Sequence, residues 1–150
     1  MRVSGQSILA IVAPQNIVNG KDPLVFQGLN TSGPEVSIVY LFPNLLIDHV
    51  MRNPPVPAGF WQGVNLNQNA IYLESFIDEI AFVIRQDPLA MRRKLMAQHL
   101  KLRAVLNAAA ERAGWGKPDA DIGGQKVYRG LAQTMGLGSY VAACAEVLVS

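Results

Sequence analysis

Few side chains in this sequence have the types and spacing that catalysis or metal binding requires. Glu74 and Asp78 form an i, i+4 pair of carboxylates. Such a pair transfers protons or holds a metal only when a pocket removes it from water. On an amphipathic helix these acids are more typical of a solvated face or of ion pairs, for which the sequence offers Arg92 and Arg93. We therefore predict a structural role for both acids.

The histidines and the single cysteine supply no catalytic pattern. His49 and His99 lie far apart in the sequence, which excludes the short spacing of metal ligands on one element. Cys144 alone cannot form an internal disulfide, a cysteine-based zinc site or an iron–sulfur site. Ser139 lacks the Gly-x-Ser-x-Gly elbow, and Gly136-x-Gly138 is too short for a phosphate-binding glycine loop. We expect His99 to end a basic helix and to interact with its dipole.

The segment from Gly59 to Asn69 is the exception. It places Phe60 and Trp61 beside a run of side-chain amides, directly ahead of the best helical pattern in the chain. Main-chain N–H groups at a helix N-terminus, with amides nearby, form a cradle for a phosphate or for a heteroatom-rich cofactor. A capped loop that packs Trp61 against its own helix explains the same residues equally well. The residues alone leave both interpretations open.

Length and composition predict one packed domain with no nucleic-acid partner and no membrane span. Half of the 150 residues are hydrophobic and 16% are charged, which favours a core over disorder. The net charge of +2 is far below the basic footprint of a nucleic-acid binder. The apolar run from Ile8 to Ala13 is much shorter than the roughly 20 residues that cross a membrane. Residues 1–7 contain no secretory signal, and the compartment stays unknown.

The hydrophobic pattern predicts a mixed α+β fold. Residues 1–58 form a strand and loop part, with short strands at β-branched runs such as Ile8 to Val12 and Val36 to Phe42. Residues 53–59 form a stiff, proline-rich linker. Residues 59–114 form the cofactor-loop and helical part, and residues 127–150 form a strand pair joined by the glycines at positions 136 and 138.

Three helices are predicted, over residues 68–84, 88–98 and 102–113. Asp87-Pro88 supplies an N-cap and a first-turn proline, and Gly114 closes the third helix. We expect acids in the first turns of the first helix, and Glu74, Asp78 and Glu79 on its solvent faces. The residues at three- and four-residue steps that we expect to face the core are Leu73, Phe76, Ile77, Ile80, Ala81 and Ile84.

The last residues read as an apolar strand with no turn or polar tail after it. A free strand of this kind invites pairing with another chain, so domains seldom stop there. We therefore expect the 150 residues to be a fragment of a larger domain, although a true terminus tucked into a sheet is the alternative.

Motifs spread over almost the whole chain share their order with a known family. They are Arg2-Val3-x-Gly5-Gln6-Ser7-Ile8, Tyr40-x-Phe42-Pro43-Asn44, Gly59-Phe60-Trp61-Gln62-Gly63-Val64-Asn65, Asp87-Pro88-Leu89-x-x-Arg92-Arg93, Ala113-Gly114-Trp115-Gly116 and Tyr128-Arg129-Gly130-Leu131-Ala132. Together they resemble the molybdenum hydroxylases of the xanthine oxidase and aldehyde oxidase family, above all large subunits of the isoquinoline 1-oxidoreductase type.

The resemblance implies part of a molybdopterin-binding domain. It implies an oxidoreductase that hydroxylates aldehydes or N-heterocycles with oxygen from water. Residues that match family contacts to the molybdenum cofactor are Phe60, Trp61, Gln62 and Gly63, with Gln68 as a supporting amide. Val64 matches a position that lines the substrate pocket. The implied partners are the remaining large-subunit polypeptide, an iron–sulfur small subunit that carries the [2Fe–2S] clusters, and the small substrate.

Two departures from the family pattern bear on activity. Relatives usually place arginine where this chain has Gln62, so a fixed charge and five donors are replaced by a neutral amide. Family members are several times longer, and their catalytic glutamate lies near the far C-terminal end. We therefore predict no catalytic residue, no metal ligand and no turnover for this chain alone. The alternatives are a non-enzymatic interaction module that kept the fold but binds no cofactor, and a piece that does not fold by itself.

Overall fold

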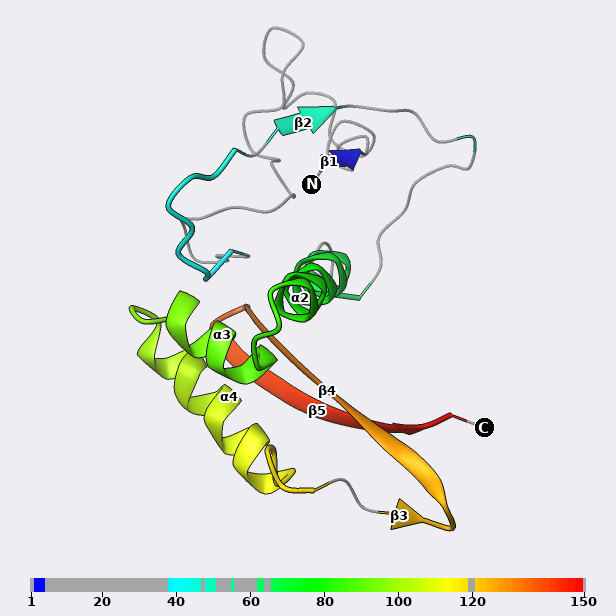
Figure 1. Cartoon of the computed structure of the whole chain (residues 1–150). Helices are drawn as coiled ribbons and strands as arrows, with labels where there is room; N and C mark the ends of the chain where they lie inside the picture. The colour runs from blue at the N-terminus through cyan, green and yellow to red at the C-terminus, as the bar shows by residue number, and fades with distance from the viewer. Residues whose placement is uncertain are drawn as a thin grey trace, which may run out of the picture.

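Helices pack on one face of a long β-hairpin in this protein (Figure 1). The structure is a computed structural model that describes residues 2–4, 38–46, 48–50, 55, 62–63, 66–118 and 121–149. The helices are α2 (Leu66–Val83), α3 (Pro88–Leu95) and α4 (Leu100–Arg112). The antiparallel sheet has the order β3 (Asp121–Ile122), β4 (Gln125–Gly136), β5 (Ser139–Leu148). A separate parallel pair joins β1 (Arg2–Ser4) to β2 (Asp48–Val50). The mixed α+β prediction is confirmed.

Local sequence signals set the start of α3 as predicted. The Asp87 carboxylate accepts a hydrogen bond from the Ala90 N–H at 2.7 Å, and Pro88 occupies the first helical position. The helix is shorter than expected, because the Met96 N–H closes its last turn on the Arg92 carbonyl and residues 96–98 form a turn. His99 then lies at the N-cap of α4, so the expectation that it ends a basic helix is wrong.

Helices α2 and α4 end in the same hydrogen-bond pattern but with different residues. In α4, Gly114 has φ +66°, and the Trp115 N–H donates to the Ala110 carbonyl at 2.9 Å. This is the Schellman arrangement, which requires a left-handed residue after the helix. In α2 the left-handed residue is Arg85, at φ +54°, and the Gln86 N–H donates to the Ala81 carbonyl. An L-residue with a side chain carries a steric cost in this conformation.

We expect Arg85→Gly to raise the free energy of unfolding by about 0.5–1 kcal/mol, because relief of the left-handed strain exceeds the added chain entropy of glycine. Urea denaturation measures the change. Gly114→Ala is the matched variant at the equivalent position of α4, and it should lower stability by about 1 kcal/mol. If both variants change the free energy of unfolding in the same direction, the two helices do not both end in a Schellman arrangement with a left-handed residue at these positions.

The hairpin of β4 and β5 confirms the predicted strand pair. Gly136 pairs with Ser139, and only Leu137 and Gly138 lie between them. Both have positive φ, at +51° and +76°, which identifies a two-residue type I′ turn. The buried residues of β4, namely Val127, Leu131 and Gln133, mark the inner face of the hairpin, against which α2 and α4 pack. The segments at 114–118 and 123–124 are turns and loop.

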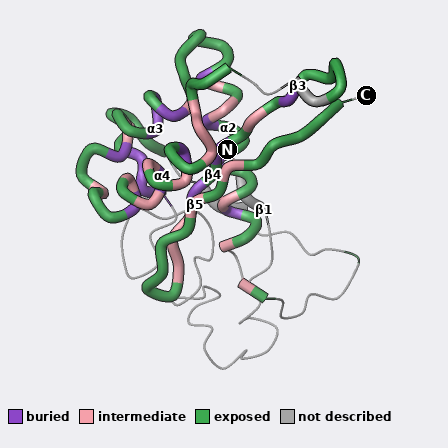
Figure 2. Tube along the Cα trace, turned by 90° about the horizontal axis from the view of Figure 1, so that it is seen from below, coloured by how far each residue is buried: buried purple, intermediate pink, exposed green. Residues whose placement is uncertain are grey.

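The core lies between the helices and the inner face of the hairpin (Figure 2). Ile77 and Ala81 are fully buried and Leu73 is nearly so, as the helical period predicts. Phe76 and Ile84 are about half exposed, so their predicted place in the core is wrong. They lie at the edge of the buried stripe, where the helices and the hairpin do not cover them.

The N-terminal part departs from expectation. Of the run Val36 to Phe42, residues 38–42 are described, and they form no strand. Ile38, Val39 and Tyr40 are instead buried in the core, and the Leu41 N–H donates to the Leu95 carbonyl at 2.8 Å. The run Ile8 to Val12 and the linker at 53–59, apart from Pro55, lie outside the described residues. Within the described part of the chain, no helix is long and apolar enough to cross a membrane.

Candidate functional site

The start of α2 is built by Gly63 and Asn67. Gly63 has φ +74°, and its carbonyl accepts a hydrogen bond from the Leu66 N–H at 2.8 Å. The Asn67 amide donates to the Gln62 carbonyl at 2.9 Å. A Cβ atom on Gly63 would lie 2.5 Å from Asn67 Oδ1, so a side chain at this position would displace the Asn67 amide. Position 63 favours glycine chiefly because of its left-handed backbone conformation.

The described cofactor candidates gather at this end of α2. Gln62 and Gln68 are both exposed, and Gly63 lies between them in the turn that begins the helix. Phe60, Trp61 and Val64 lie outside the described residues. The first turn of α2 contains no acidic residue, so the predicted first-turn acids are wrong: the helix begins at Leu66, ahead of them. The first turn of α2 itself therefore contributes no carboxylate to offset the partial positive charge of the helix N-terminus.

The hairpin turn lies directly against this helix start. A Cβ atom built on Gly136 would overlap the side chain of Leu66. This contact places the end of β4 beside the turn that contains Gly63. The C-terminal hairpin therefore packs against the start of α2, where the described cofactor candidates lie.

A buried polar cluster lies farther along α2, centred on Glu74. The Tyr40 hydroxyl donates to Glu74 Oε1 at 2.6 Å, and Arg92 Nε donates to Oε2 at 2.9 Å. The Gln133 side chain donates to Oε1 at 3.0 Å, and its main-chain N–H donates to Oε2 at 3.2 Å. Arg92 Nη1 also donates to Asp78 at 2.6 Å. Four segments that are remote in sequence are thus joined around one carboxylate.

Burial and charge both act on this cluster. Burial raises the pKa of Glu74, while Arg92 and the hydrogen bond from Tyr40 act in the opposite direction. Burial and the adjacent Glu74 carboxylate raise the pKa of Tyr40, so its hydroxyl stays protonated and serves as a donor. The guanidinium of Arg92, fully buried, is the counter-charge for both acids.

The cluster corrects the sequence-based interpretation of Glu74. Its predicted position on a solvent face is wrong, since Glu74 is 4% exposed. The pairing of Glu74 and Asp78 with Arg92 is confirmed, whereas Arg93 bonds the Asn107 side chain instead. Nothing in the sequence singled out Gln133. The i, i+4 acids were the only local signal of the cluster.

One acceptor of the cluster receives no hydrogen bond from the residues that the structure describes. Gln133 Oε1 is buried, and no described residue donates to it. The amide orientation is fixed by the other end, because Nε2 donates to both Tyr40 and Glu74. Among the described residues, no group of three or more His, Cys, Asp or Glu side chains is placed to hold a metal ion. The described residues of the cluster form a buried network of hydrogen bonds and ion pairs around Glu74.

Comparison with known proteins yields one distant relative of interest. No family model matches the chain, and no solved structure matches it. The chain is 29% identical over 110 residues to the isoquinoline 1-oxidoreductase subunit beta of Brevundimonas diminuta. The match covers 73% of this chain but only 14% of that relative. The chain thus has a distant similarity to a short stretch of an oxidoreductase subunit, in agreement with the resemblance that the motifs indicate.

Proposed function

We propose that this chain is part of the large subunit of a molybdopterin-dependent oxidoreductase and contributes one wall of its cofactor site. In this proposal Phe60, Trp61, Gln62 and Gly63 contact the cofactor, and Gln68 supports them. Val64 lines the pocket for an aldehyde or N-heterocyclic substrate. The observation that carries the proposal is the similarity to isoquinoline 1-oxidoreductase subunit beta, which spans 73% of this chain.

The geometry at the start of α2 supports this role. The exposed side chains of Gln62 and Gln68 offer amide donors and acceptors at a helix N-terminus that has no acidic residue in its first turn. Gly63 has no side chain, which lets the Asn67 amide pack against the turn and donate to the Gln62 carbonyl. These features fit a heteroatom-rich, anionic group such as a pterin with a phosphate.

In this proposal the cofactor and the side chains of this chain have different roles. When bound, the molybdenum cofactor supplies the redox chemistry of hydroxylation. The side chains of this segment bind and orient; among the described residues at the start of α2 there is no carboxylate or histidine to act as a general base. The base, the remaining large-subunit polypeptide and an iron–sulfur partner subunit would come from outside these 150 residues.

The second candidate function is an interaction module that binds no cofactor. The amide at position 62 favours this candidate, because Gln62 stands where relatives of the resembled family usually carry arginine.

Binding of molybdopterin to the purified chain, kept free of oxygen, separates the two candidates. We expect saturable quenching of tryptophan fluorescence, and we expect Gln62→Arg to tighten binding about five- to tenfold by adding a charged donor. Gln98→Arg is the matched control, since it adds the same charge at an exposed turn beyond α3 and should leave the affinity unchanged. Equal effects of the two variants, or no quenching at all, would favour the interaction module.

A further inference from the structure

Strand β5 has a free edge in the described part of the chain. Its pairing partner is β4, and the sheet order ends at β5. Residues that flank a two-residue hairpin turn form a hydrogen-bonded pair, and the bonded pairs then alternate along the ladder. Ser139 and every second residue after it therefore bond to β4. The residues between them, Tyr140, Ala142, Cys144, Glu146 and Leu148, direct their N–H and C=O groups away from β4, toward the free edge.

This edge lacks the features that normally prevent strands from pairing. It is 10 residues long and contains no proline and no lysine, and Glu146 is its single charged residue. Monomeric proteins usually blunt such an edge with charge, proline or a bulge. The edge is therefore suited to accept another strand.

The outer face of the hairpin is uncharged between Tyr128 and the turn, and Lys126, whose ammonium lies 5.0 Å from the centre of the Tyr128 ring, is the charged residue of β4 at its far end. The uncharged part consists of the cross-strand pairs Tyr128–Val147, Gly130–Ala145, Ala132–Ala143 and Thr134–Val141. On β5 this face is symmetric about Cys144: Ala143 and Ala145 flank it, and Val141 and Val147 lie beyond them. A strand with this pattern is complementary to a reversed copy of itself.

We propose that β5 pairs antiparallel with β5 of a second copy of this chain, about a two-fold axis at Cys144. Val141 then faces Val147 of the second copy, and Ala143 faces Ala145 of the second copy. Cys144 faces its own counterpart. The pairs whose main-chain groups point outward, Cys144 with Cys144 and Ala142 with Glu146 of the second copy, each exchange two hydrogen bonds, whereas the Val141–Val147 and Ala143–Ala145 pairs bring side chains together. The two three-stranded sheets then form one continuous six-stranded sheet.

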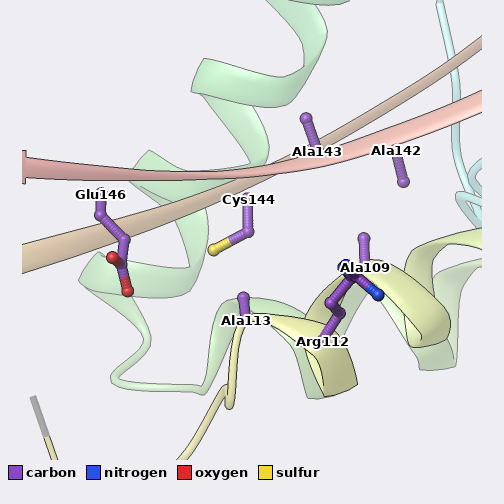
Figure 3. Close-up of a pocket in the computed structure, with 7 residues that line it drawn as sticks. All are labelled: Ala109, Arg112, Ala113, Ala142, Ala143, Cys144 and Glu146. Atoms are coloured by element: carbon purple, nitrogen blue, oxygen red, sulfur yellow. The ribbon is translucent and has the colours of Figure 1, made fainter.

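Charges along the edge fit the same register. A groove of about 610 Å³ runs between α4 and β5, lined by Ala109, Arg112 and Ala113 from the helix and by Ala142, Ala143, Cys144 and Glu146 from the strand. Figure 3 shows Arg112 and Ala109 beneath Ala142, with Glu146 at the opposite end. The register places Glu146 of the second copy opposite Ala142, at the Arg112 end. Each copy therefore presents Arg112 to the other's Glu146, in two symmetric ion pairs.

The pair within one copy does not prevent this contact. Arg129 Nε donates to Glu146 Oε1 at 2.7 Å, and a carboxylate accepts several donors. The interface consists of one strand edge and two exposed ion pairs, which is at the small end of protein interfaces. We therefore expect a concentration-dependent dimer.

A charge exchange on the outer face tests the register. Val141 and Val147 are both 54% exposed, so lysine at either position does not disturb the core. Val141→Lys with Val147→Lys places lysine opposite lysine twice and should leave a monomer over about a hundredfold concentration range in sedimentation equilibrium. Val141→Lys with Val147→Glu places opposite charges together and should keep the dimer. Thermal melting checks that both variants fold.

Oxidation of the single cysteine tests the axis. Directly opposed residues in a hydrogen-bonded pair have Cα atoms about 5.5 Å apart, which suits a disulfide. Burial and Glu146 raise the pKa of Cys144, so oxidation is done near pH 9 to supply thiolate. We expect a disulfide-linked dimer on non-reducing gels. Ala143→Cys combined with Cys144→Ala moves the thiol opposite Ala145 and should reduce cross-linking at least tenfold. A wild-type chain that stays monomeric, or equal cross-linking from positions 143 and 144, would overturn the proposal.

Discussion

Replacing Arg92 with methionine is expected to lower the free energy of unfolding by about 3–5 kcal/mol. Methionine keeps much of the side-chain volume but removes every donor that Arg92 directs at Glu74 and Asp78. The Glu74 carboxylate then remains buried without its counter-charge, and an uncompensated buried charge is far more costly than a lost surface pair. Urea denaturation at neutral pH measures the loss.

Two comparisons separate the buried charge from lost packing. Arg93→Met, at an exposed neighbour in the same helix, should cost less than about 0.5 kcal/mol. Adding Glu74→Gln to Arg92→Met should recover more than half of the loss, because the buried charge is then gone. If the double variant recovers none of the lost stability, the loss in Arg92→Met comes from packing at position 92 and not from the buried charge.

The loss in Arg92→Met should also depend on pH. Burial already raises the pKa of Glu74 in the folded state, and removal of Arg92 raises it further. A carboxyl group with a raised folded-state pKa contributes stability below its unfolded pKa, near 4.3, and loses that contribution as the pH rises through the folded value. The variant should therefore approach wild-type stability as the pH falls toward 4.

Replacing Ile77 with alanine is the second large effect, an expected loss of about 3–4 kcal/mol. Ile77 is fully buried on the face of α2 that meets the core, so truncation removes buried methyl groups and leaves a cavity. Phe76→Ala is the matched comparison. Phe76 is 48% exposed, so its truncation should cost under about 1.5 kcal/mol although the side chain is larger. If Phe76→Ala lowers the free energy of unfolding more than Ile77→Ala does, the observed orientation of α2, with Ile77 toward the core and Phe76 toward solvent, is contradicted.

The sequence predicted where the helices and strands lie better than it predicted which of their side chains are buried. Capping residues and glycines act through neighbours in the chain, so Asp87, Pro88 and Gly114 sufficed to locate two helix ends. The apolar period of α2 correctly identified Ile77 and Ala81. It overestimated the buried stripe at Phe76 and Ile84, because the width of that stripe depends on which elements cover it.

Glu74 shows where sequence reasoning stops. Its partners Tyr40 and Gln133 are 34 and 59 positions away, and no local pattern signals that a carboxylate will find three distant donors. The candidate site is a prediction from the combination of aromatic and amide residues at 59–69 together with the family resemblance. Its geometry depends on Gly63, on Asn67 and on the approach of the hairpin at Gly136. The spacing of residues in the sequence does not predict these contacts.

We propose that the start of α2 is the contact surface for the molybdenum cofactor. Amide chemical shifts of the isotope-labelled chain, recorded as molybdopterin is added without oxygen, show which residues the cofactor touches. We expect the largest shift changes at Gln62, Gly63 and the first turn of α2, including the side-chain amides of Asn67 and Gln68. Changes confined to another surface, such as the groove beside Trp115 and Lys117, or no changes at saturating pterin, would contradict the account.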